Sequence, residues 1–176
     1  MPRVKIKTSS PSGTNKQKLL RTLSDQLIYA TRIITTPDAF LVLTRTDDDA
    51  DKIFSSTTLD LLKADNFQPL LPPEIRAKRT IVLRNTDEHI YNNTEKEIEA
   101  ELLNENDFLN EGIENIFKIP KTKIIKITLN SSTAAKKATD KGLLAFHMSI
   151  PHFNISIDEH IPLMTCLKCS HRGPPD

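Results

Sequence analysis

Hydrophobic positions along this chain repeat with a period of two in short runs and with a helical period between them. In residues 125–129, apolar side chains alternate with polar ones, which is typical of a half-buried strand. An alanine-rich segment follows, with serines 131–132 as candidate N-caps and Gly142 at its predicted end. Residues 143–150 alternate again until Pro151, and this pattern predicts a strand, a helix and a further strand.

The same order of elements is predicted twice along the chain. The first helix is expected to begin at Asn15, and the next to follow an acidic run that suits a helix start. Thr94 and Glu97 form a capping box for a third helix. The predicted strands are residues 4–8, 32–36, 39–45, 67–71, 80–85, 113–119, 123–130 and 143–150.

This order predicts an α+β protein made of two tandem ferredoxin-like β-α-β-β-α-β units, which resemble RNA-recognition motifs. The predicted first unit covers residues 1–73, and a proline-flanked linker covers residues 74–79. The second unit is expected at residues 80–160, and a tail covers residues 161–176.

The net charge of +1 hides a strong separation of charge along the chain. Residues 1–24 hold six basic groups and no acid, whereas residues 87–114 hold ten acids against one lysine. Residues 118–141 then hold seven lysines against one aspartate. A nearly neutral protein can therefore present a basic face that attracts phosphate, although each charge run also suits an ordinary solvated surface.

RNA-recognition-type domains stack bases on aromatic side chains of their central strands, so the open face of the second sheet is informative. No stacking aromatic is expected there, and sequence-specific readout through this sheet is therefore not predicted. The residues expected on the open face are Val82, Arg84, Ile124, Lys126, Thr128 and His147.

Lysines cluster around the predicted hairpin of the second unit. Lys118, Lys121, Lys123 and Lys126 flank this hairpin, and further lysines follow on the next helix. Such a surface can grip phosphates without reading bases. A solvated basic edge that discourages strand pairing explains the same lysines equally well.

The two cysteines, Cys166 and Cys169, are spaced as in half of a zinc knuckle. Four ligands are needed for a structural zinc site, so this incomplete pair binds zinc only if a further ligand is supplied. An inert pair of thiols or a shared site is the simpler expectation. We therefore expect no cofactor in this chain.

Enzymatic motifs are missing from the sequence. None of its four glycines belongs to a phosphate-binding loop, and the acidic run at residues 47–51 suits a helix start better than a metal cluster. Without a long apolar run or a signal segment, the chain is expected to be intracellular, in the cytoplasm or nucleus, and not membrane-bound. A small-molecule substrate is not expected, and the chain is predicted not to be an enzyme.

Two longer phrases carry a family resemblance. The stretch KIPKTKIIKITLNSSTAAKKATDKGLLAFHMSIP and the later IPLMTCLKC, with a basic linker before RTIVLRN, resemble the gag-like protein of jockey-type non-LTR retrotransposons. The match is best over residues 79–169, which resemble the domain preceding the CCHC zinc knuckles. The resemblance implies RNA or DNA binding, self-association into ribonucleoprotein particles, and Cys166 and Cys169 as the first ligands of a knuckle. This chain departs from the pattern after Cys169, as if truncated within the first knuckle.

The sequence thus predicts a protein that binds RNA or single-stranded DNA with low sequence preference and assembles ribonucleoprotein. The alternatives are a self-assembly module without direct nucleic-acid contacts and a relic that has lost its activity. The predicted nucleic-acid-binding residues are Arg76, Lys78, Arg79, Arg84, Lys118, Lys121, Lys123 and Lys126.

Overall fold

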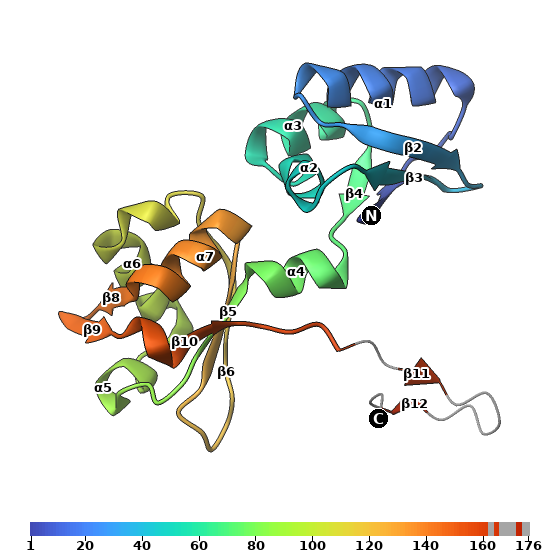
Figure 1. Ribbon diagram of the computed structural model, residues 1–176. Helices are drawn as coiled ribbons and strands as arrows, with labels where there is room; N and C mark the ends of the chain where they lie inside the picture. Colours follow the sequence, from blue (N-terminus) through green and yellow to red (C-terminus); the bar gives the residue numbers. More distant parts are fainter. Residues whose placement is uncertain (162–163, 166–171, 174–176) are drawn as a thin grey trace.

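The computed structural model describes residues 1–161, 164–165 and 172–173. These residues form two units, each built on a four-stranded antiparallel sheet. Figure 1 shows the helix α4 (Pro73–Arg79) joining the two units. Beyond the second unit, β11 (Met164–Thr165) and β12 (Arg172–Gly173) pair as a short antiparallel ladder.

The first unit has three helices and four strands. Its sheet order is β2-β3-β1-β4, which places β1 and β3 at the centre. The elements are β1 (Arg3–Lys7), α1 (Gly13–Asp25), β2 (Ala30–Thr35), β3 (Ala39–Thr44), α2 (Asp47–Ile53), α3 (Ser56–Ala64) and β4 (Gln68–Leu70).

The second unit has the sheet order β10-β5-β7-β6. Its helical elements are α5 (Glu88–Tyr91), α6 (Glu95–Glu105), η1 (Asp107–Leu109), α7 (Ser132–Lys141) and η2 (His152–Asn154). Its strands are β5 (Thr80–Leu83), β6 (Ile113–Lys118), β7 (Ile125–Leu129), β8 (Leu143–Ala145), β9 (Met148–Ile150) and β10 (Ile155–Ile157).

Both sheets have the strand arrangement of a split βαβ motif. In each unit the first and third strands of the sheet are central, and the second and fourth lie at the edges. Helices cover one face of each sheet, as Figure 1 shows for α6 and α7 in the second unit. The predicted α+β class, with two tandem ferredoxin-like units, is therefore confirmed.

Each unit has its own hydrophobic core. In the first, Phe40 and Phe67 meet edge to face with ring centroids 6.3 Å apart. In the second, the predicted alternation of residues 125–129 places Ile125, Ile127 and Leu129 in the core. Two separate apolar clusters form because each sheet buries only the face that its own helices cover.

Helix capping follows the sequence closely, with one exception. The capping box of Thr94 and Glu97 is present, and Gly142 ends α7 with a φ of 81°. A Cβ atom at Gly142 would lie 2.6 Å from the carbonyl oxygen of Ile150, so this position requires glycine. The first N-cap was predicted at Asn15, but Ser12 caps α1 by accepting from the Asn15 amide.

The predicted fourth strand of the second unit is wrong. Residues 143–150 form a hairpin of β8 and β9 instead of one strand, with Phe146 and His147 in its turn at φ angles of 52° and 58°. The alternation is compatible with both structures because a two-residue turn preserves the period of two. The fourth strand of the sheet is β10, which pairs with β5.

Helix α4, in the segment predicted as a linker, packs against both units. Its Ile75 belongs to the first core, while Arg79 is buried and reaches Asp51 at the end of α2. Arg79 Nε donates to Asp51 Oδ1 at 2.8 Å, and the guanidinium lies 5.5 Å from the centre of the Phe54 ring. The Asp51 carboxylate also accepts from Ser132, the first residue of α7. One carboxylate therefore ties α2, α4 and α7 together.

Asp49 in α2 makes the stability of the first unit sensitive to acid. Burial disfavours its charged form, but the Thr46 hydroxyl and the Tyr29 amide donate to the carboxylate, and the balance lowers the pKa of Asp49. A lowered pKa in the folded state stabilises the protein above the unfolded pKa of about 4. This stabilisation is lost as the pH falls through the folded pKa.

We therefore expect Asp49→Asn to lower the free energy of unfolding at pH 6 and to have much less effect at pH 3. Urea unfolding of both proteins at the two pH values measures this difference. An equal loss at pH 6 and pH 3 would contradict the role of the Asp49 charge.

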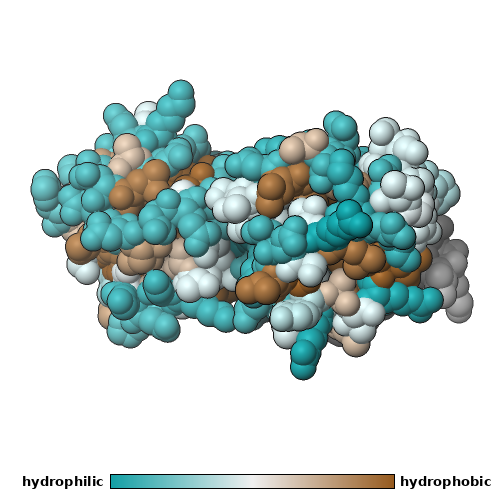
Figure 2. Space-filling view, turned by 90° about the horizontal axis from the view of Figure 1, so that it is seen from above, coloured by the Kyte–Doolittle hydropathy of each residue, from teal (hydrophilic) through white to brown (hydrophobic). Residues whose placement is uncertain are grey.

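Hydrophilic side chains cover most of the surface seen from above. Figure 2 shows hydrophobic side chains there in narrow strips on both units. None of the helices in the described part of the chain has the length and apolar character needed to cross a membrane.

Candidate nucleic-acid interface

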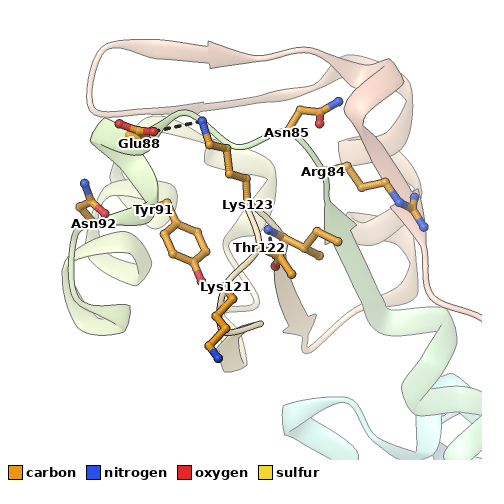
Figure 3. Close-up of a pocket in the computed structure, with 9 residues that line it drawn as sticks. Arg84, Asn85, Glu88, Tyr91, Asn92, Lys121, Thr122 and Lys123 are labelled. Carbon is orange, nitrogen blue, oxygen red and sulfur yellow. Dashed lines mark hydrogen bonds and ion pairs between the residues drawn. The ribbon is translucent and has the colours of Figure 1, made fainter.

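A shallow pocket of about 790 Å³ lies at one end of the second sheet (Figure 3). Three segments form it: the turn after β5, helix α5, and the loop between β6 and β7. Its lining residues are Arg84, Asn85, Glu88, Tyr91, Asn92, Lys121, Thr122, Lys123 and Ile124. Three of the predicted nucleic-acid-binding residues, separated by up to 39 positions in the sequence, therefore meet at one place.

The loops around this pocket are fixed by short hydrogen bonds. The Ile119 amide donates to the Ile124 carbonyl at 3.0 Å, and the Thr122 hydroxyl donates to the Ile119 carbonyl at 2.8 Å. The Thr86 amide donates to the Lys123 carbonyl at 3.0 Å and joins the two loops. Because the backbone is tied at these points, the cationic side chains extend from a defined rim.

The three cations of the pocket differ in their partners. Lys123 pairs with Glu88 at 3.1 Å, and both side chains are exposed. Arg84 donates to the Ser156 hydroxyl on β10. Lys121 has a φ of 61°, and its ammonium group makes no ion pair with the described residues. An exposed ion pair contributes little energy, so Lys123 can exchange Glu88 for a phosphate group.

Lys118 is placed differently from the prediction. Its side chain points to the helical side of the sheet, where its amine donates to the carbonyls of Tyr91 and Asn93 at 3.3 and 2.9 Å. The same amine lies 5.5 Å from the centre of the Tyr91 ring. These contacts hold the half-buried Lys118 against α5, and it does not line the pocket.

An ion pair crosses the middle of the open sheet face. Lys126 on β7 pairs with Asp158, just after β10, at 3.0 Å. Because β5 lies between β7 and β10, the pair spans Val82, which is only 5% exposed. The open face therefore has a sealed centre where an RNA-recognition-type domain needs an accessible platform.

The open face also contains one aromatic side chain that the sequence analysis missed. Phe117 on β6 lies opposite Lys126, and 53% of it is exposed. Strict alternation from Ile113 places Phe117 on the buried face, but a bulge between Ile113 and Asn115 reverses the alternation. Ile113 and Ile116 are both buried. Two apolar residues three positions apart do not fit strict alternation, and this spacing was the available signal for the bulge.

Among the other predicted open-face residues, the position of His147 was predicted wrongly, because His147 lies in the turn between β8 and β9. Thr128 and Ile124 are half-buried along β7 and at its start. Thr128 is within hydrogen-bond distance, 3.0 Å, of Thr80 on β5.

The linker cations do not gather at the pocket. Arg76 pairs with Glu114 at 2.6 Å, and Lys78 pairs with Asp47. Arg79 is 4% exposed and bound to Asp51, so it is not available at the surface, contrary to the expectation. Cys166 and Cys169, with their predicted incomplete zinc site, lie outside the described residues.

The ion pair across the sheet leads to a prediction about Asp158. Asp158→Asn removes the carboxylate charge that holds Lys126, so we expect tighter binding of single-stranded RNA, by a few-fold at low salt. Fluorescence anisotropy with a labelled unstructured RNA measures this change. Glu159→Gln, the neighbouring acid, is the matched control, and an equal gain from both variants would contradict a specific role for Asp158.

The class of fold is thus two ferredoxin-like units in tandem, with the candidate site in the second. No model of a known protein family matches the chain, and no curated protein matches it either. Among solved structures, the chain is similar to the N-terminal three RNA-binding domains of the yeast splicing factor Prp24. The sequence identity is 16% and the TM-score 0.37, over 91% of this chain and 67% of the other. Our fold assignment rests on the strand order described above.

Proposed function

We propose that this chain binds single-stranded RNA or DNA with low sequence preference, through the second unit. One pocket is lined by Arg84, Lys121 and Lys123, and this observation carries the proposal. Such a group of cations binds phosphates, and the aromatic ring that lines the pocket, Tyr91, is tied to the loop because its hydroxyl donates to the Ile119 carbonyl. The role is one of binding, and the proposal includes no catalytic step and no cofactor.

Phe117 supports a path for the strand beyond the pocket. Lys121 lies four positions further along the chain, so the two residues are at most about 13 Å apart along extended backbone. Any of the four bases can stack on an exposed aromatic ring, so such stacking selects little for sequence. A strand whose phosphates lie at the pocket can therefore place a base on the Phe117 ring.

The first test is a titration of the purified protein with unstructured single-stranded RNA and DNA at two salt concentrations. Three phosphate contacts correspond to a slope of about −2 in a plot of log affinity against log salt. Affinity should then fall about 16-fold between 50 and 200 mM salt. Absent binding, or binding that is independent of salt, would refute the proposal.

Phe117→Ala is expected to weaken binding by about 1–3 kcal/mol, the usual effect of losing one base-stacking ring. Its salt slope should stay the same because no cation is removed. Tyr29→Ala is the control, since Tyr29 is an exposed aromatic of the first unit. Anisotropy titrations of both variants measure the difference, and equal affinities would exclude Phe117 from the binding surface.

A role in ribonucleoprotein assembly, as in the retrotransposon gag-like proteins that the sequence resembles, is the finer form of this proposal. Within it, self-association is the second candidate function. Helix α6 is strongly acidic and has an exposed Leu103, close to the exposed Leu144 of β8. Helix α7 exposes Lys136 and Lys137, so the two helices suit contacts between copies. Light scattering without nucleic acid would show concentration-dependent oligomers that Lys136→Glu/Lys137→Glu abolishes.

A further inference from the structure

The outer face of the first sheet combines aliphatic and basic side chains. The strands bury one set of alternate residues against the helices, including Val4, Ile6 and Phe40. The other set faces outward, and its cross-strand neighbours are fixed by the register. This outer face includes the aliphatic residues Ile34, Leu41, Leu43 and Leu70, the basic residues Arg3, Lys5, Lys7 and Arg32, and Gln68.

The aliphatic residues lie close together and are accessible. Ile34 on β2 is opposite Leu41 on β3, which is opposite Lys5 on β1, and Lys5 is opposite Leu70 on β4. Ile34 is 36% exposed, and Leu41 and Leu70 are half-buried. One row across the sheet thus offers three aliphatic side chains.

The charged residues of this face are all basic, and the acid Asp38 lies beside them. Lys5 pairs with Asp38 at 2.9 Å, at the turn between β2 and β3. Arg3, Lys7 and Arg32 form no ion pair with the described residues. A ligand with negative charge on its flanks would therefore find unpaired cations on both sides of the apolar row.

The composition of the face favours a protein ligand over nucleic acid. None of the residues named above has an aromatic ring, so this face has no platform for stacking bases. Phosphate binding alone gives no use for a row of aliphatic side chains, whereas an amphipathic helix buries its own apolar stripe there. Neighbouring strands are about 4.8 Å apart, close to the 5–6 Å between residues i and i+4 of a helix.

We propose that the outer face of the first sheet docks an amphipathic helix of a partner protein. The apolar stripe of this helix contains Leu or Ile, and its flanks contain Asp or Glu. Helix residues i and i+4 lie over Ile34 and Leu41, and residue i+11 lies over Leu70, beyond Lys5. Acidic flanking residues pair with Lys7 and Arg32. This surface is separate from the nucleic-acid pocket of the second unit.

The experiment uses the full chain and a fluorescein-labelled synthetic helix with a leucine stripe and glutamate flanks. We expect saturable anisotropy, with binding weakened about tenfold or more by Lys7→Glu/Arg32→Glu. Leu41→Ser should weaken it as well, because it removes the middle of the apolar row. Arg21→Glu/Lys63→Glu, the same charge change at exposed residues of helices α1 and α3 in the first unit, should leave peptide affinity unchanged. A second peptide with lysine flanks should not bind.

Four results would overturn this proposal. The first is no binding of the acidic helix, and the second is binding that none of the outer-face variants weakens. The third is a loss of RNA affinity in Lys7→Glu/Arg32→Glu as large as its loss of peptide affinity, which would assign the face to nucleic acid. The fourth is oligomers of the chain alone that Leu41→Ser disperses, which would assign the face to a second copy. Circular dichroism of each variant confirms that the fold is retained.

Discussion

Lys121→Glu/Lys123→Glu is expected to weaken binding of single-stranded RNA by at least tenfold at low salt. Both side chains are exposed at the rim of the pocket in the second unit, so the substitutions change the local charge without disturbing a core. Two of three phosphate contacts are lost, and the salt slope should fall from about −2 to about −0.7. The loss should be similar for unrelated RNA sequences because phosphate contacts carry no sequence information.

The matched control is Lys136→Glu/Lys137→Glu, which makes the same change in net charge on the exposed side of α7. If binding depends on net charge alone, both double variants will weaken it equally, and the pocket is then not the site. Anisotropy titrations at 50 and 200 mM salt separate the two cases. Light scattering of each sample shows whether the variants also change the mass of the protein.

Arg79→Met is expected to lower the free energy of unfolding by about 3 kcal/mol. The Arg79 guanidinium is buried and donates to both the side chain and the backbone carbonyl of Asp51. Removing one member of a buried ion pair leaves the other charge without compensation. The Ser132 hydroxyl alone then remains with the Asp51 carboxylate, and α2 and α7 lose their shared link to α4.

Arg76→Met is the control for this variant because Arg76 is also in α4 and also pairs with an acid, Glu114, but is exposed. Such a surface pair contributes about 0–1 kcal/mol. Urea unfolding followed by circular dichroism compares the two variants. A loss of less than about 1 kcal/mol for Arg79→Met would show that the junction does not depend on this arginine.

Much of the fold was predictable because its signals are local. Alternation in residues 125–129, the capping box at Thr94 and the glycine at 142 each depend on backbone geometry within a few residues. Such preferences act before any tertiary contact forms and persist in the folded protein. The order of these elements then limits the possible sheet topologies to a few.

The predictions failed where one local pattern is compatible with two structures. Residues 143–150 alternate equally well as one strand or as a hairpin, and long-range contacts favour the hairpin. The amide side chain of Asn106 donates to the Leu144 carbonyl at 2.8 Å and accepts from the Leu144 amide at 3.0 Å. The buried Asn106 side chain, between α6 and η1, thus makes the hydrogen bonds to β8 that a neighbouring strand would make. No pattern within residues 143–150 reveals this contact.

The sequence predicted that the candidate site contains basic residues, but it predicted only some of the residues that form the site. Clustered lysines pointed to the hairpin, and Lys121 and Lys123 lie at the pocket together with Arg84. Lys118 and Arg79 were predicted at the interface because each belongs to a basic cluster of the sequence, at the hairpin and in the linker. Both side chains are held by partners distant in sequence, so their positions depend on contacts that the sequence pattern does not contain.

By itself, the sequence determined the two ferredoxin-like units, most of their helices and strands, and the segregation of basic and acidic segments. Local propensity and periodicity are sufficient for these features because they depend on neighbouring residues. Only the tertiary structure decided which cations converge on the pocket, that Lys126 and Asp158 seal the sheet centre, and that a bulge exposes Phe117. Each of these depends on strand register and packing between distant segments, where a shift of one residue exchanges the buried and open faces.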